Sequence, residues 1–153
     1  MGHLRESLEK FPTTGRILCV DHGEKTLGLA VGDRLQGVAT PLVTLKRTKM
    51  KQDVIALRPI LDDYDVQALI FGYPLDQHGQ PGKRAQSVTD YAKALAEQLS
   101  LPIALWDERF STSAVDKFMI NTVDMSRTKR KQNVDKLAAQ FILQGALDFL
   151  TGL

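Results

Sequence analysis

Short apolar runs, separated by polar turns, organise the first third of the chain. The first run covers residues 16–21 and the second covers residues 27–32. A third extended stretch, residues 37–45, contains Pro41, which suits an edge strand or a bulge because proline has no N–H to donate to a neighbouring strand. Three short strands with tight connections predict an antiparallel meander.

After this meander, apolar positions at helical spacing alternate with apolar runs of strand length. The elements expected here are helix 53–61, strand 66–71, helix 85–99, strand 102–106, helix 111–118 and helix 134–150. Strands that alternate with helices are parallel and buried. We therefore expect an α/β protein with a mixed five-stranded sheet flanked by helices.

Three local features complete this outline. Leu4, Leu8 and Phe11 have helical spacing and predict a short N-terminal helix. The polar and basic residues 121–132 are expected to form a loop. In the last helix, Phe141 is expected to point inward with the other apolar residues.

Length and composition fit one folded domain. We assign residues 1–15 of the 153 to an N-terminal extension and residues 16–150 to the domain. Cys19 is the only cysteine and lies in an apolar run, so we expect a buried thiol in a reducing compartment. Because no apolar run reaches the ~20 residues that cross a bilayer and no signal-peptide core is present, we expect a cytoplasmic protein without a membrane partner.

Positive charge is clustered rather than abundant. The formal net charge is only +2, which does not by itself indicate nucleic-acid binding. One cluster contains Lys46, Arg47, Lys49 and Lys51, and another contains Arg127, Lys129, Arg130, Lys131 and Lys136. Such patches suit a surface that follows backbone phosphates, and ordinary solvated surface explains them equally well.

Acidic residues end two of the expected strands. Asp21 ends the first apolar run, and Asp107 with Glu108 ends the run at 102–106. Strand ends meet at one edge of an α/β sheet, where ligands and metals bind. Asp135 is a third candidate, in the first turn of the last expected helix. Taken singly, each acid has a simpler explanation as a turn, loop or helix-dipole residue.

Four motifs extend along the chain in a fixed order. They are VDHGEKTLGLA at 20–30, FGYPL at 71–75, DERFST at 107–112, and VDKLAA at 134–139, which is followed by ILQ at 142–144. Together they resemble the YqgF/RuvX family of Holliday junction resolvases, which have a ribonuclease H-like fold. Two positions depart from the family pattern: Thr26 stands where arginine is common, which removes one possible phosphate contact, and Tyr73 replaces the usual leucine.

The resemblance implies that Asp21, Glu108 and Asp135 form a catalytic acidic triad that holds two divalent ions, Mg²⁺ or Mn²⁺. Two such ions, roughly 3.5–4 Å apart, activate a water molecule and stabilise the leaving oxygen of a phosphodiester. All-oxygen ligands suit these metals. Three carboxylates packed together without metal would repel one another, which argues against a purely structural cluster.

Several basic residues are candidates for nucleic-acid binding. Arg109 either contacts phosphate or pairs with a neighbouring acid. Lys83 and Arg84, at the end of a glycine-containing loop, either clamp a strand or are solvated. Arg127, Lys129 and Arg130 belong to the second basic cluster. His22 is expected to point away from the metals because side chains alternate along a strand.

Three functions are compatible with these sequence features. The first is a metal-dependent nuclease acting on structured nucleic acid, either the 5′ end of precursor 16S rRNA or branched DNA. The second is a non-catalytic nucleic-acid-binding module on the same fold. The third is an ATPase, because a strand followed by Asp-x-Gly also begins the actin and sugar-kinase fold, but 153 residues are too few for its two lobes.

Overall fold

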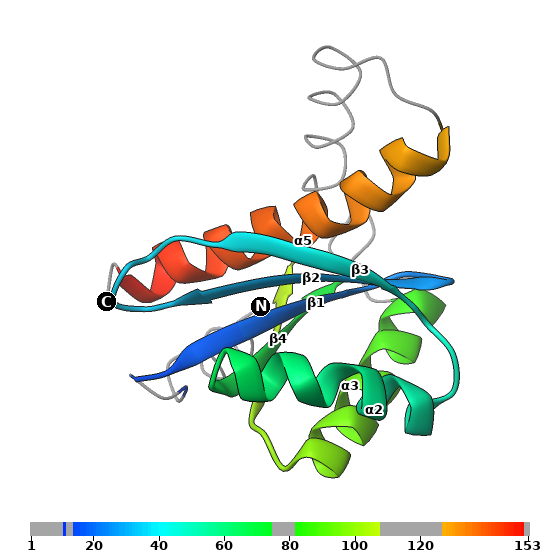
Figure 1. Ribbon diagram of the computed structural model, residues 1–153, viewed down its shortest axis with the longest axis horizontal. Helices are drawn as coiled ribbons and strands as arrows, with labels where there is room; N and C mark the ends of the chain where they lie inside the picture. Colours follow the sequence, from blue (N-terminus) through cyan, green and yellow to red (C-terminus); the bar gives the residue numbers. More distant parts are fainter. Residues whose placement is uncertain (1–10, 12–13, 75–81, 108–126, 152–153) are drawn as a thin grey trace.

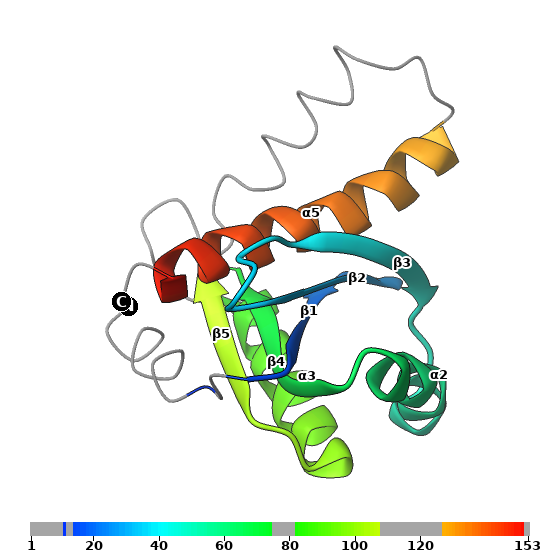
Figure 2. The ribbon, with the colours of Figure 1, turned by 60° about the vertical axis from the view of Figure 1, so that its left-hand side comes forward.

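Five strands form one mixed sheet in the order β3-β2-β1-β4-β5 (Figures 1 and 2). The computed structural model describes residues 11, 14–74, 82–107 and 127–151, the side chains of 127–136 excepted. The strands are β1 (Arg16–His22), β2 (Thr26–Asp33), β3 (Thr40–Lys46), β4 (Val66–Tyr73) and β5 (Ile103–Asp107). The first three are antiparallel, and β4 and β5 run parallel to β1. The predicted α/β fold is confirmed.

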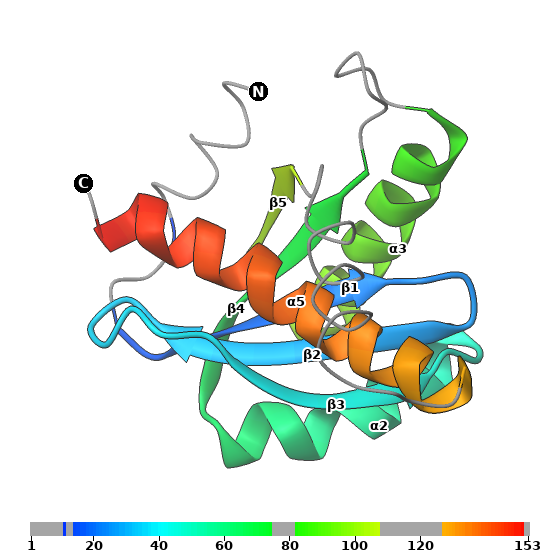
Figure 3. The same cartoon turned by 90° about the horizontal axis from the view of Figure 1, so that it is seen from above.

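Helices cover both faces of this sheet. Two of them, α2 (Met50–Asp63) and α3 (Lys83–Leu99), lie on one face, and α5 (Arg127–Thr151) crosses the other (Figures 1 and 3). Pro59 lies inside α2 without ending it. The three layers create two apolar cores, one on each side of the sheet.

Side chains of β1 divide between these cores by strict alternation. Ile17 and Cys19 lie in the core beneath α5, whereas Leu18 and Val20 lie in the core beneath α2 and α3. This is the two-residue period of a strand that is buried on both faces. The thiol of Cys19 is fully buried, as predicted.

The edge strand β3 is shorter than predicted and irregular. Its pairing with β2 shifts register between Gly28 and Ala30, which agrees with the edge strand or bulge expected around Pro41. Residues 37–39 do not join the strand. Instead, the side-chain amide of Gln144 on α5 donates to the Gly37 carbonyl at 2.8 Å and accepts from the Ala39 N–H at 2.9 Å.

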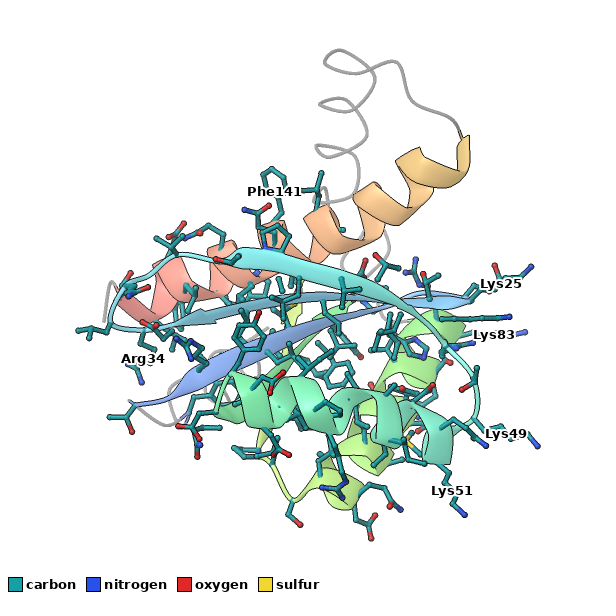
Figure 4. All side chains as sticks on the ribbon, viewed as in Figure 1. Lys25, Arg34, Lys49, Lys51, Lys83 and Phe141 are labelled. Carbon is teal, nitrogen blue, oxygen red and sulfur yellow. The ribbon has the colours of Figure 1, made fainter. Side chains whose placement is uncertain are left out.

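Two predictions about the last helix are wrong. Residues 127–132, predicted as loop, are the first turns of α5, which rise away from the sheet in Figures 1 and 2. Lysine, arginine and glutamine are good helix formers, so this segment needs no apolar face. Phe141 is 46% exposed and points away from the sheet (Figure 4), because Ile142 and Leu143 fill the stripe that faces the sheet. The predicted helices at 4–11 and 111–118 lie outside the described residues, except for Phe11, which is buried.

Candidate active site

The carboxyl ends of the three parallel strands meet at one edge of the sheet. Register pairs Val20 of β1 with Phe71 of β4, and Phe71 with Leu105 of β5. Asp21 follows Val20 directly, and β5 ends at Asp107. The sheet therefore brings Asp21 and Asp107 to the same edge, as the sequence predicted.

Asp21 stands between two glycines on its neighbouring strands. Gly28 of β2 is its direct partner, and on β4 Gly72 follows Phe71, the partner of Val20. Glycine has no side chain, so neither neighbouring position places one beside the carboxylate. The carboxylate is partly exposed at a rigid strand end.

The face on which Asp21 lies is the one crossed by α5. Asp21 comes two residues after Cys19, whose side chain packs beneath α5, and strand alternation gives both the same face. Trp106 of β5 also packs against this core, and its ring centroid lies 5.8 Å from that of Phe149 on α5. Thus α5 is held against both β1 and β5.

The rest of the predicted triad is only partly described. Asp135 lies in α5, and Glu108 comes directly after the last residue of β5. The side chains of both lie outside the described residues, as do Arg109 and the side chains of Arg127, Lys129 and Arg130. Among the side chains that are described, no group of three metal-binding residues occurs. The predicted triad therefore stays a prediction.

His22 faces the opposite side of the sheet from Asp21, as alternation predicts. Its side chain is 6% exposed and lies against Tyr91 of α3, with ring centroids 4.5 Å apart. Nη1 of Arg47 donates to Nε2 of His22. Because a guanidinium has only donors, Nε2 is the acceptor and the imidazole proton is on Nδ1.

Charge and burial hold His22 in its neutral form. Removal from water, and then the positive charges of Arg47 and Arg84, lower the pKa of His22 from 6.5 to about 4. On the other side of His22, the hydroxyl of Tyr91 donates to Oδ2 of Asp53 at 2.8 Å. Burial and this hydrogen bond raise the pKa of Tyr91, so the hydroxyl keeps its proton.

Asp53 anchors this chain of contacts. Its side chain is 2% exposed, and Oδ1 accepts from the backbone N–H of Thr48 at 2.9 Å and from the Thr48 hydroxyl at 3.1 Å. We call Asp53, Tyr91, His22 and Arg47 the polar relay. It connects α2, α3, β1 and the end of β3.

A pocket of about 570 Å³ opens where the polar relay reaches the surface. Its charged lining residues are Glu24 and four cations, Lys25, Arg47, Lys83 and Arg84. The other lining residues are His22, Gly23, Thr26 and Ser87. Lys25 and Lys83 project from neighbouring elements at this end of the molecule (Figure 4). We call this the basic pocket.

The basic pocket contains two residues that the sequence predicted to bind nucleic acid, Lys83 and Arg84, and also Arg47, which the sequence did not single out. Lys83 and Arg84 were predicted to bind nucleic acid, and the structure places both in this pocket. Arg47 was visible only as a member of a basic cluster. Its contact with His22 spans 25 positions in the sequence, so no local pattern signals it.

Comparison with solved structures relates the fold to resolvases. RuvC from T. thermophilus, in complex with Holliday junction substrate, matches with a TM-score of 0.54 and 13% identity, over 91% of this chain and 97% of that chain. The yeast mitochondrial Holliday junction resolvase Ydc2 matches with a TM-score of 0.53 and 12% identity, over 96% and 84%. These matches show that the chain has a ribonuclease H-like fold.

The chain belongs to the RuvX family. The family model, described as a Holliday junction resolvase, matches residues 15–149. Two similar proteins are each described as a "Putative pre-16S rRNA nuclease". The one from Rhodospirillum centenum is 46% identical over 97% of this chain and 81% of its own length, and the one from Paramagnetospirillum magneticum is 44% identical over 96% and 94%. The protein is accordingly a nuclease.

Within the described part of the chain, no helix is long and apolar enough to span a membrane.

Proposed function

We propose that this protein is a metal-dependent nuclease that hydrolyses phosphodiester bonds in structured nucleic acid, with Asp21, Glu108 and Asp135 as its catalytic acids. The observation that carries this proposal is the position of Asp21. It is the next-to-last residue of β1 and lies between two glycines, on the face covered by α5. Asp135 belongs to α5, and Glu108 directly follows β5, the parallel strand whose end reaches the same edge.

The donor set suits a hard divalent cation. Three carboxylates offer only oxygen atoms, which Mg²⁺ and Mn²⁺ prefer. When bound, such ions supply an activated water and stabilise the leaving oxygen. Asp21, Glu108 and Asp135 would hold the ions. The pairing of Asp21 with Gly28 of β2, and of the preceding Val20 with β4, would keep the Asp21 backbone in place.

The substrate we propose is the 5′ end of precursor 16S rRNA, with branched DNA as the other candidate. Two similar proteins carry the first activity in their descriptions, and the family description carries the second. The fully buried thiol of Cys19 fits a reducing compartment, and we propose the cytoplasm as the place of action.

The decisive experiment compares wild type with Asp21→Asn, in Mn²⁺, on four-way junction DNA and on RNA with the precursor 5′ extension. The exposed Asp63 on α2 provides the matched control, Asp63→Asn. We expect Asp21→Asn to slow cleavage by about a hundredfold or more, because a ligand to the metals is lost, and Asp63→Asn to cleave normally.

Two outcomes would remove the assignment. Equal cleavage by wild type and Asp21→Asn would point to a contaminating nuclease. Salt-sensitive binding without cleavage in any divalent ion would instead support the non-catalytic binding module.

A further inference from the structure

We propose that the basic pocket binds a phosphate group of the same nucleic-acid strand that Asp21 cleaves, and that Arg47, held by the polar relay, is the principal phosphate ligand. This inference rests on the proposed nuclease function and adds a substrate-binding subsite to it. It draws on the charge of the pocket, the fixing of Arg47 and the position of the pocket relative to Asp21.

The charge of the pocket favours an anion. Four cations and one carboxylate, Glu24, line it. A phosphate carried by a nucleic-acid strand is the anion that a nuclease meets, and binding it releases counterions from the strand.

Arg47 is fixed in a way that a solvated arginine is not. It is only partly exposed, and its guanidinium donates one hydrogen bond to His22. Its backbone N–H donates to the Lys25 carbonyl at 2.8 Å, which ties it to the turn between β1 and β2. A guanidinium has five donors in a planar fork, so donors remain for two phosphate oxygens. Less side-chain entropy is lost on binding when the arginine is already oriented.

Arg47 contacts His22, the ring of His22 packs against Tyr91, and the Tyr91 hydroxyl is fixed by Asp53. A buried polar group is costly unless it is hydrogen-bonded, and the Asp53 carboxylate and the Tyr91 hydroxyl satisfy each other in this way. An arginine that is only solvated at a basic surface needs no such set of buried contacts. In this arrangement His22 presents Nε2 as the acceptor for Arg47.

Covalent geometry relates the pocket to the cleavage site. Asp21 and His22 are consecutive, with Cα atoms about 3.8 Å apart, and their side chains lie on opposite faces of the sheet. A nucleic-acid strand that is bound across the carboxyl end of β1 would therefore meet both the Asp21 carboxylate and the basic pocket. The pocket would hold a phosphate near the one that is cut.

The test measures binding of fluorescein-labelled junction DNA and precursor RNA in EDTA, between about 50 and 200 mM salt, by fluorescence anisotropy. The variants are Arg47→Ala, Arg47→Lys and Lys83→Ala. Lys51→Ala is the matched control, because Lys51 is exposed on α2 and does not line the pocket (Figure 4). Binding in EDTA tests the pocket independently of cleavage, so failure of the nuclease assignment and failure of this proposal give different results.

We expect Arg47→Ala and Lys83→Ala each to raise Kd several-fold and to reduce the salt slope by about 1, and Lys51→Ala to leave both nearly unchanged. Arg47→Lys should keep the salt slope but weaken binding, because lysine cannot present the same fork. His22→Leu should weaken binding only when Arg47 is present, which identifies His22 as a positioning residue. Substrates with and without a 5′-phosphate distinguish a terminal phosphate from a backbone phosphate.

Two results would overturn the proposal. Unchanged binding by Arg47→Ala and Lys83→Ala would show that the pocket contacts no phosphate. An equal loss for Lys51→Ala would show a diffuse electrostatic surface without a defined subsite. Circular dichroism of each variant checks that altered binding does not come from unfolding.

Discussion

The hydroxyl of Tyr91 donates a 2.8 Å hydrogen bond to the buried carboxylate of Asp53, and this contact joins α3 to α2. The same ring packs against His22 at the end of β1. One side chain thus connects the two helices on this face with the strand that carries Asp21.

Replacing Tyr91 by phenylalanine tests how much this contact stabilises the fold. The change keeps the ring but removes the donor, leaving Oδ2 of Asp53 buried without that partner. We expect the free energy of unfolding to fall by about 1–3 kcal/mol, measured by urea denaturation. Tyr64→Phe is the control, because Arg16 contacts the ring and the backbone carbonyl of Tyr64, and it should cost less than about 0.5 kcal/mol. An equal effect of both changes would contradict this account.

The low pKa of His22 predicts a specific dependence of stability on pH. Folding lowers this pKa from 6.5 to about 4. The unfolded chain therefore binds a proton more readily, and the contribution of His22 to stability is present above pH 6.5 and is lost as the pH falls toward 4. Between about pH 7 and pH 4.5 the loss amounts to about 2 kcal/mol.

Other groups also titrate in this range, so the measurement must isolate His22. His22→Gln keeps a polar side chain with an acceptor but has no titration there. Urea denaturation of wild type and His22→Gln at several pH values should give curves whose difference shrinks as the pH falls. A difference that is constant with pH would show that His22 does not titrate as described.

Gly32 is a point of close approach between β2, the segment before β3 and α5. A Cβ at this position would lie 2.7 Å from the Val38 carbonyl oxygen and 2.8 Å from Cδ1 of Leu147. Backbone cannot yield cheaply, so Gly32→Ala should destabilise the protein by about 1–3 kcal/mol in thermal or urea unfolding. Gly82→Ala is the control, because a Cβ on Gly82 would have no atom of the described residues within 4 Å, its chain neighbours aside. A destabilisation by Gly82→Ala as large as that by Gly32→Ala would contradict the steric explanation.

Gln144 fastens the chain before β3 to α5 with two hydrogen bonds, to Gly37 and Ala39. Gln144→Met keeps the length of the side chain and removes both, and Ala39 is almost fully buried. We expect a loss of about 1–3 kcal/mol in the free energy of unfolding, and faster hydrogen exchange at the Ala39 amide. The exposed Gln52→Met should leave both quantities near their wild-type values. Unchanged exchange at Ala39 in Gln144→Met would contradict the role of Gln144.

The sheet was predictable because local signals agreed with the final fold. β1, β2 and β4 are apolar runs bounded by turn residues, and their observed limits differ from the predicted ones by no more than two residues. The shared edge of Asp21 and Asp107 followed from the parallel order of β1, β4 and β5. The start of α5 was missed because a polar helix lacks the apolar periodicity that identifies helices.

The polar relay could not be predicted from the sequence. Its contacts connect residues that are 25 positions apart, His22 and Arg47, and 38 positions apart, Asp53 and Tyr91. Tyr91 matched the inward spacing of an apolar helix face, which says nothing about what its hydroxyl reaches. The packing of α2 against α3 brings Asp53 to Tyr91, and the pairing of the first three strands brings Arg47 to His22.

The alternation of Asp21 and His22 has a consequence for how such an enzyme chooses where to cut. In the proposed site, the Asp21 carboxylate and the imidazole that contacts Arg47 belong to consecutive residues of one strand, so motion of the strand end would carry both together. An enzyme with the proposed site would set the position of its cut by the distance from a bound phosphate, and not by the identity of the bases in between.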